Sequence, residues 1–456
     1  MSFRKTFASA TTALALILAA QTASAESLGG ALAAAYNNSG LLEKNRAVLR
    51  AADEDVAQAV AALRPTITWA IKSTSTWVPN RSAGQDWSDP TVEGALRLTQ
   101  SLFDSGIGRM TVEAKKEAVL ASRQALLSVE QEVLIDAISA YLDVRSTAEF
   151  TSLRESNVRV LTQELRAAQD RFDVGEVTRT DVSLAEAALA SARSLLAVAQ
   201  GNQVNARETY RVAVGQVPTS LDAAPVARLP MDQASAVAYA LQNHPSIVQL
   251  QHTVRAQELA ADMSNRATRP TLDLTALTGA DEDLNYAGQV ELSLSGPIYS
   301  GGLIASRQRA AQANLDEYRA ALHQASLSIE QAVISAYAQY QVAVAASEAY
   351  QQQVNAAQLA FDGVREEANA GSRTTIDVLN AEQDLLDARA NLVDAQSTVV
   401  LASYAVLSTM GLLTAESLNL DVTLYDVEAY YNLVAKAPVA LSPQGAALDR
   451  ILGQQD

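Results

Sequence analysis

The chain has 456 residues, no cysteine, and 51 acidic against 34 basic residues, which gives a formal net charge of −17. This acidity argues against nucleic acid as a partner, and the lack of cysteine is compatible with an oxidising compartment without disulfide bonds. The three histidines fall on expected helices without clustered acids, and no thiol, phosphate-binding glycine loop or metal-ligand spacing is present, so an enzyme is not expected and no cofactor or metal is expected.

Residues 1–25 have the pattern of a secretory signal peptide. Arg4 and Lys5 form a basic start, residues 13–20 are apolar, and Ala23-Ser24-Ala25 is a small-residue cleavage site. We therefore expect export, with the mature chain beginning near Glu26. Beyond this segment no apolar run of 18 residues is uninterrupted, so we expect no transmembrane helix.

Two segments with the same pattern follow, and they indicate an internal duplication. We expect residues 26–214 to form a first structural repeat, residues 215–230 a linker, and residues 231–414 a second repeat. The sequence Gly175-Glu-Val-Thr178-Arg-Thr-Asp181 recurs 196 positions later as Gly371-Ser-Arg-Thr374-Thr-Ile-Asp377. Such a duplication implies two equivalent structural units. The remaining residues, 415–456, form a C-terminal tail that we expect to be partly disordered.

Each repeat has the same expected order of elements: a helical region, two strands, a long helix and a return helix. In the first repeat these are a helix over 28–63, strands at about 66–78 and 92–102, a long helix over 108–171 and a return helix over 178–214. In the second repeat the strands cover about 271–279 and 288–298, the long helix 302–369 and the return helix 374–410. The first repeat carries extra residues between its strands, in a loop near 79–90.

The expected strands alternate apolar and polar residues. This pattern fits a half-exposed soluble sheet and also a membrane barrel, in which Glu93, Arg97 and Glu291 would face the lumen. Four strands cannot close a membrane barrel, because the smallest ones use about eight strands, so a barrel requires several chains. Aromatic residues near the strands are consistent with an interfacial belt or with packing against helices: Trp69, Trp77, Phe103 and Tyr299.

The long helices are the second unusual feature. Residues 108–171 contain no proline and no internal glycine, whereas average globular helices have about 11–12 residues. Apolar residues spaced by seven indicate a coiled coil or a helical barrel: Val119, Leu126, Val133 and Ala140 in the first repeat, and Leu315, Leu322, Ile329 and Ala336 in the second. Gly175 and Gly371 follow the long helices and are expected to supply turns with positive φ.

A secretory signal, a duplicated helix–hairpin–helix unit and glycine turns at both helical tips together resemble the TolC family of outer-membrane efflux and secretion channels. The resemblance covers roughly residues 26–431. It implies a mainly α fold with a small β part, in which each chain forms one third of a trimeric 12-stranded outer-membrane β-barrel continued by a periplasmic α-helical barrel. It also implies a Gram-negative outer-membrane location, contact with outer-membrane lipid, and two protein partners, a periplasmic adaptor and an inner-membrane transporter.

The resemblance also implies roles for residues at the two tips. Asp181 would pair with Arg373 in a clasp that holds the periplasmic entrance shut, and Ala368 replaces an aromatic residue that completes this clasp in the family. Asp377 would line the narrowest ring of the tunnel and favour cations. A second acid three residues later is Asn380 here, so we expect one carboxylate ring instead of two.

A structural alternative exists for both aspartates. The spacing Thr178–Asp181 and Thr374–Asp377 is also that of a helix N-cap followed by an acid at the third helical position, where a negative charge is favourable without any role in transport. Both roles are compatible. Arg373 has no capping role and is therefore the more diagnostic residue.

The main functional hypothesis is a passive trimeric exit duct of a tripartite efflux pump or type I secretion system. The alternative is a soluble periplasmic coiled-coil adaptor or scaffold, which would explain the signal and the helical hairpins but not the paired strands with one apolar face. The sequence does not distinguish among drugs, metals and proteins as cargo.

Overall fold

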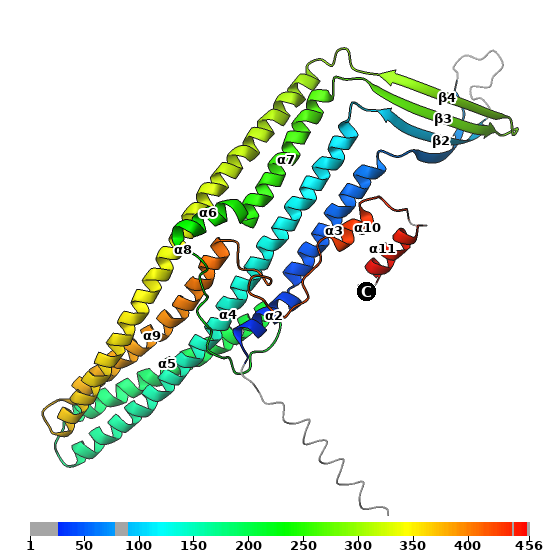
Figure 1. Ribbon diagram of the computed structural model, residues 1–456. Coiled ribbons are helices and arrows are strands. Elements are labelled where there is room, and N and C mark those ends of the chain that lie inside the picture. Colours follow the sequence, from blue (N-terminus) through cyan, green and yellow to red (C-terminus); the bar gives the residue numbers. More distant parts are fainter. Residues whose placement is uncertain (1–25, 78–89, 440–441, 454–456) are drawn as a thin grey trace, which may run out of the picture. The chain divides into compact units, whose positions relative to one another are not determined.

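The computed structural model describes residues 26–77, 90–439 and 442–453, so the expected signal peptide and most of the loop between the first two strands lie outside the described residues. The elements, labelled in Figure 1 where space allows, are α2 (Leu28–Asn38), α3 (Gly40–Ala61), β1 (Thr66–Thr74), β2 (Thr91–Phe103), α4 (Ile107–Asp173), α5 (Arg179–Val214), α6 (Gln233–Asn243), α7 (Pro245–Arg266), β3 (Thr271–Asp281), β4 (Tyr286–Ser295), α8 (Leu303–Asn369), α9 (Thr375–Thr409), α10 (Ala429–Val434) and α11 (Pro443–Gly453).

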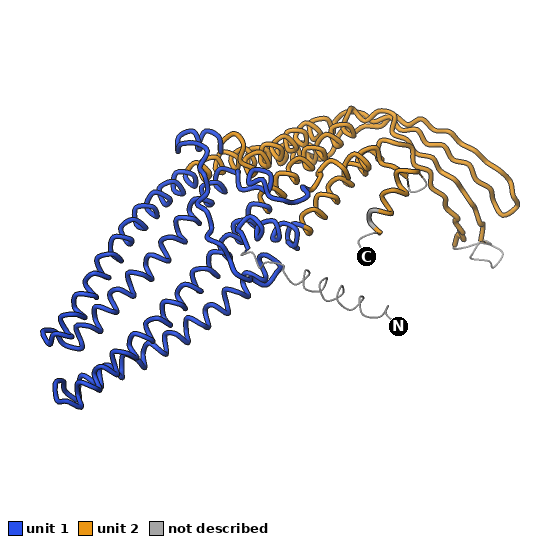
Figure 2. Tube along the Cα trace, turned by 60° about the horizontal axis from the view of Figure 1, so that its bottom comes forward, with its two compact units in different colours: residues 1–42, 130–240, 331–424 blue, residues 43–129, 241–330, 425–456 orange. Residues whose placement is uncertain are grey.

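The chain divides into two compact units, which Figure 2 shows in different colours. Among the described residues, unit 1 consists of 26–42, 130–240 and 331–424, and unit 2 consists of 43–77, 90–129, 241–330, 425–439 and 442–453. The long helices α4 and α8 contribute residues to both units. Each unit thus combines segments from both sequence repeats.

The helix expected over residues 28–63 is wrong as a single element, because it is interrupted at Ser39. The Oγ of Ser39 accepts a hydrogen bond from the Leu42 backbone N–H (3.2 Å), so Ser39 caps the start of α3. The side chain of Asn38 donates to the carbonyl oxygen of Val214 (3.2 Å), and a Cβ at Gly215 would lie 2.5 Å from the Cβ of Asn38. The end of α2 is therefore fixed against the end of α5, a contact that sequence periodicity cannot reveal.

In unit 2, the four strands form one antiparallel sheet in the order β1-β2-β3-β4. The register places apolar residues of all four strands on one face: Ile67, Trp69 and Ile71 on β1, Leu96 and Leu98 on β2, Leu272 and Leu274 on β3, and Val290, Leu292 and Leu294 on β4. Glu93, Arg97 and Glu291 share the opposite face. An irregularity between Ser101 and Phe103 shifts the register near the end of β2.

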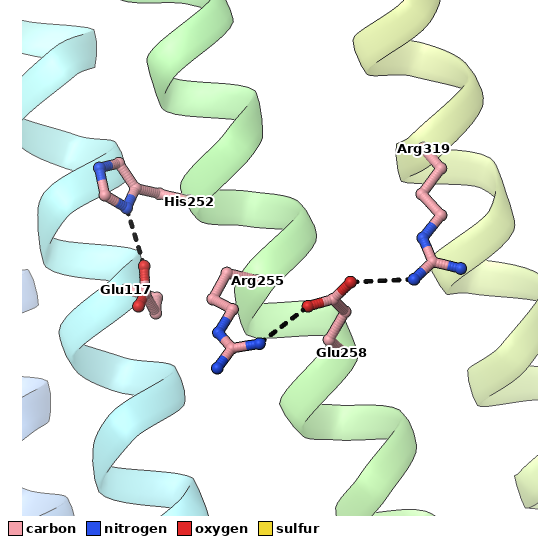
Figure 3. Close-up of polar contacts among 5 residues, drawn as sticks. All are labelled: Glu117, His252, Arg255, Glu258 and Arg319. Carbon is pink, nitrogen blue, oxygen red and sulfur yellow. Dashed lines mark hydrogen bonds and ion pairs between the residues drawn. The ribbon is translucent and has the colours of Figure 1, made fainter.

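Polar contacts connect the helices of unit 2 across the two repeats. The ring Nδ1 of His252 on α7 lies 2.8 Å from a carboxylate oxygen of Glu117 on α4 (Figure 3). Glu258 on α7 accepts hydrogen bonds from Arg255 (3.1 Å) and from Arg319 on α8 (2.9 Å). These two arginines lower the pKa of the Glu258 carboxyl, Arg319 having the larger effect. The contact between His252 and Glu117 ties the first repeat to the second, and the contact between Glu258 and Arg319 ties two helices of the second repeat to each other.

The tail, expected to be partly disordered, contains two short helices in its described part. Tyr430 on α10 is buried in a cluster with Ala57, Val434 and Leu448, and its hydroxyl donates to Glu54 (2.7 Å). The tail sequence gave no sign of this packing, because the contacts are made to α3, and Tyr430 and Glu54 are 376 positions apart in the chain.

In unit 1, two helical hairpins lie side by side, one from each repeat (Figures 1 and 2). Residues of α4 and α5 form the first hairpin, and residues of α8 and α9 form the second. The hydroxyl of Tyr141 lies 2.8 Å from the carbonyl oxygens of both Glu26 and Asp222, and its counterpart Tyr337 donates to the carbonyl oxygen of Met231 (2.8 Å). Equivalent tyrosines thus anchor three backbone segments: Tyr141 holds Glu26 and the linker residue Asp222, and Tyr337 holds Met231, which follows the linker.

Among the described helices, α5 is long and apolar enough to cross a membrane by length and composition alone. The sequence criterion of an uninterrupted apolar run did not find it. Alanine-rich composition raises the hydropathy of α5, and its buried residues Val182, Ala185 and Ala192 pack against α4 and α9. Because α5 forms one arm of the first hairpin, we interpret it as a packing helix.

Candidate gate at the hairpin tips

Each hairpin tip begins with a glycine that ends the preceding long helix. Gly175 has a φ of +81° and Gly371 a φ of +80°, the left-handed conformation that favours glycine. At the first tip the N–H of Glu176 donates to the carbonyl oxygen of Arg171 (2.9 Å), and at the second the N–H of Ser372 donates to that of Glu367 (2.9 Å). This bond, from an N–H to the carbonyl oxygen five residues earlier across a glycine with positive φ, is the Schellman arrangement, which satisfies carbonyl groups at the helix end.

The first residues of α5 and α9 form two nearly identical capping boxes. A carboxylate oxygen of Asp181 accepts from the Thr178 N–H (2.9 Å) and hydroxyl (2.7 Å), and the Asp181 N–H donates back to the Thr178 hydroxyl (3.3 Å). Thr374 and Asp377 repeat these contacts at 2.9, 2.7 and 3.4 Å. The hydrogen bond from the Thr178 side chain, above all, lowers the pKa of Asp181, and the Thr374 backbone N–H lowers that of Asp377. The capping interpretation therefore holds for both aspartates.

Arg373 has a different partner from the one expected. Its Nε lies 2.7 Å from a carboxylate oxygen of Glu367, in the last turn of α8. Within the described part of the chain, the structure does not bring Arg373 and Asp181 into an ion pair. Sequence reasoning did not identify Glu367 as the partner of Arg373. The signal that could have indicated it is its position just before the tip, six residues from the arginine.

The other residues proposed for the gate lie close by. Ala368 on α8 is buried in a cluster with Phe361 on the same helix and with Val378 and Leu385 on α9. Asn380 is exposed on the second turn of α9, three residues beyond Asp377 and on the same side of the helix. The carboxylate and the amide can therefore face the same space.

The sheet of unit 2 offers a second functional surface. Its apolar face is uncovered in the single chain: Ile67, Trp69 and Val290 each keep 70% or more of their surface exposed. Among the described residues β1 pairs only with β2 and β4 only with β3, so both outer strands present free edges. Trp69 lies inside β1 rather than at its end, whereas Phe103 ends β2 and Tyr299 follows β4. An apolar face with two open edges requires a partner of its own kind or a lipid phase.

Comparison with known proteins shows which family has this architecture. The sequence profile of the outer membrane efflux protein family matches residues 31–216 and 236–412, one segment in each repeat. The outer membrane efflux protein BepC of Brucella suis is 36% identical over 92% of this chain and 92% of its own length. TolC of Escherichia coli is 27% identical over 77% of this chain and 74% of its own. In fold, the crystal structure of the Campylobacter jejuni CmeC outer membrane channel superposes with a TM-score of 0.77 at 15% identity, covering 90% of each chain.

Proposed function

This chain belongs to the outer membrane efflux protein family, and we propose that three copies of it form a passive exit duct that opens at the hairpin tips of unit 1. It is an outer-membrane channel protein, and its family consists of channels, not enzymes. The observation that carries the proposal is the sheet of unit 2, with its apolar face and two free edges. The alternative of a soluble periplasmic adaptor or scaffold leaves this face unexplained and is not supported by the family.

The strand order makes closure by identical copies geometrically simple. With four antiparallel strands in the order β1-β2-β3-β4, β4 runs opposite to β1, so β4 of one copy can pair with β1 of the next in an antiparallel ladder. Three copies supply the 12 strands expected from the family, about 50% more than the smallest membrane barrels need. In this arrangement the apolar face contacts lipid, and Glu93, Arg97 and Glu291 face an aqueous lumen.

The helical part provides the passage across the periplasm. We infer that a periplasmic adaptor and an inner-membrane transporter bind at the tips and supply the energy of transport, so that the duct itself performs no chemistry. In the assembled duct Arg373 exchanges Glu367, in the last turn of α8, for Asp181, in the first turn of α5 of a neighbouring tip. Asp377 and Asn380 line the entrance, where a single carboxylate ring favours cations.

Single-channel conductance of the purified mature trimer in planar bilayers tests this proposal. Arg373→Ser is compared with Arg179→Ser, which removes an equally exposed positive charge from the other tip. We expect a small, cation-preferring conductance that increases in Arg373→Ser and stays unchanged in Arg179→Ser. Equal conductance of all three proteins would refute the clasp and leave the duct. A protein that remains in solution without detergent and never inserts would refute the duct.

A further inference from the structure

A buried polar pair connects the two hairpins of unit 1 above the tips. The side-chain amide of Asn157 on α4 donates to a carboxylate oxygen of Glu382 on α9 (3.2 Å). Asn157 is 4% exposed and Glu382 is 7% exposed. Glu382 lies seven residues into α9, about 10 Å of helix from its start. The pair therefore belongs to the interior of the bundle and is separate from the exposed capping boxes.

Two small cavities flank this pair, one on each side. A cavity of about 100 Å³ is lined by Asn157 and Glu382 together with α5 residues such as Ala192. A second cavity of about 80 Å³ is lined by Asn157 and Glu382 together with Phe361 and Arg389. Each is large enough to hold water, because a cavity of about 10–15 Å³ already admits one molecule. Glu382 thus stands where the two hairpins can part and admit solvent.

The charged surroundings of Glu382 come from three of the four helices. Arg389 is on α9 itself and bonds to Gln358, Glu164 is on α4, and Arg365 is on α8, where its Nε lies 3.6 Å from Glu164. Helix α5 lines the first cavity with Ala188, Ser191, Ala192 and Leu195 and contributes no charge. Burial raises the pKa of the Glu382 carboxyl, and the hydrogen bond from Asn157 and the two arginines offset part of this effect.

The duplication shows that this burial is specific to the second repeat. The residue equivalent to Glu382 is Glu186 on α5, 196 positions earlier, and it is exposed. The residue equivalent to Asn157 is Gln353, also exposed. The same carboxylate therefore occurs at corresponding positions of two hairpins, but only one copy is enclosed and hydrogen-bonded to the other repeat.

We propose that Asn157 and Glu382 form an internal latch, which holds α9 against α4 and is released when ionised Glu382 becomes hydrated as the hairpins separate. This inference rests on the proposed function, a duct that opens at the tips, and adds a proton-sensitive positioning residue to it. A carboxyl group that is harder to ionise when packed binds its proton more tightly in the packed arrangement. Lowering the pH toward the ordinary range of a glutamate then favours packing, and raising it favours separation.

Two opposite substitutions test the latch. Glu382→Gln keeps the shape and cannot ionise, so we expect lower conductance at neutral pH and loss of the pH dependence above the ordinary pKa range of a glutamate, with changes on the order of tenfold for each unit of pKa difference. Asn157→Ala removes the donor and destabilises the ionised carboxylate in the packed state, so conductance increases. Glu186→Gln is the matched control and should leave both conductance and its pH profile unchanged.

A second readout does not depend on ion flow. The chain lacks cysteine, so Ala192→Cys introduces a single thiol at the wall of the first cavity, and its rate of modification by a small thiol reagent reports separation of the helices. We expect this rate to fall in Glu382→Gln and to rise in Asn157→Ala.

If Glu382→Gln behaves like Glu186→Gln while Arg373→Ser still opens the channel, the latch is wrong and the duct stands. Loss of the trimer in both pair variants would assign the pair a structural role only and overturn the latch. If the protein never conducts, the duct fails, and the thiol rates still decide the latch.

Discussion

At the hairpin tips, the side chains of Asp181 and Asp377 can have two roles, helix capping and ion selectivity, and these roles depend on different properties of the carboxylate. The carboxylate position satisfies backbone N–H groups at a helix start, and the negative charge sets the potential at the entrance. Because the capping contacts are nearly identical at the two tips, capping alone explains why an aspartate occurs at each site. A role in ion selectivity needs a test that changes the charge and keeps the cap.

Thr374→Ala and Asp377→Asn provide that separation. Asn retains an oxygen acceptor for the cap but removes the charge, so we expect cation preference to fall while amide exchange in the first turn of α9 stays slow. Thr374→Ala removes the reciprocal hydroxyl, with a cost of about 1 kcal/mol, so exchange should accelerate while selectivity is retained. Reversal potentials in a salt gradient and hydrogen exchange measure the two effects. Unchanged selectivity in Asp377→Asn would leave Asp377 as a cap only.

Asp53 on α3 is, like Glu382 on α9, a buried acid whose charged form is disfavoured by burial. It is 1% exposed, one of its carboxylate oxygens lacks a hydrogen-bond partner, and burial raises its pKa to about 6, against the opposing influence of Arg123. Between about pH 4 and 6 the folded chain holds a proton that the unfolded chain has lost, so stability falls as the pH rises through this window and then stays low. We expect Asp53→Asn to raise stability at pH 7 by up to about 3 kcal/mol.

The midpoint of thermal inactivation, measured from pH 4 to pH 7 in about one-unit steps, checks this expectation. The decrease of this midpoint with rising pH should be smaller in Asp53→Asn, because the neutral side chain binds no proton in either the folded or the unfolded state. Asp55→Asn, on the same helix, removes an exposed carboxylate that pairs with Lys115 and should not make this decrease smaller. A variant as pH-dependent as the wild type would show that another group is responsible.

At the level of elements, alternation of apolar and polar residues predicted the four strands of the described chain within a few residues, and uninterrupted stretches without proline predicted both long helices. Alternation in residues 92–102 was sufficient for β2, which covers Thr91–Phe103, because a two-residue period has no helical interpretation. The break at Ser39 and the packing of α10 were missed, since both depend on contacts with distant segments. The pairing of β2 with β3 is likewise a long-range property, and it imposes a constraint on Gly279 that the sequence does not display.

Gly279 on β3 and Gly288 on β4 should respond differently to the same substitution. A Cβ at Gly279 would lie 2.6 Å from the carbonyl oxygen of Gly94, a backbone atom that cannot move without disturbing β2. At Gly288 the nearest atom is 3.8 Å away, an ordinary contact. We expect Gly279→Ala to destabilise the sheet by about 1–3 kcal/mol and Gly288→Ala to be tolerated. The yield of heat-modifiable trimer on gels measures this, and equal yields would contradict the β2–β3 register.

For the whole molecule, the duplication predicts two equivalent repeats, and the fold then makes them unequal. Glu186 and Glu382 occupy corresponding positions, yet one is exposed and the other is enclosed between hairpins. Local sequence is similar in both cases, so no pattern within one repeat could assign the buried copy. The asymmetry arises only when the second hairpin packs against the first. The candidate tip residues, in contrast, could be identified from the repeated motif, because turns and helix caps are determined by local sequence.

The two faces of the sheet give the most direct test of the assembled duct. Leu292 and Ser293 are neighbours near the middle of β4, but the register places Leu292 opposite Leu274 on the apolar face and Ser293 opposite Asp273 on the polar face. An arginine on a lipid-facing position near the membrane centre costs about 2–4 kcal/mol, whereas a lumen position tolerates charge. We expect Leu292→Arg to abolish insertion of the trimer into the outer membrane, and Ser293→Arg to insert normally with reduced cation conductance. Heat-modifiable trimer in outer-membrane fractions measures insertion. If the two variants insert equally well, the apolar face does not contact lipid, and the sheet must instead be covered by protein.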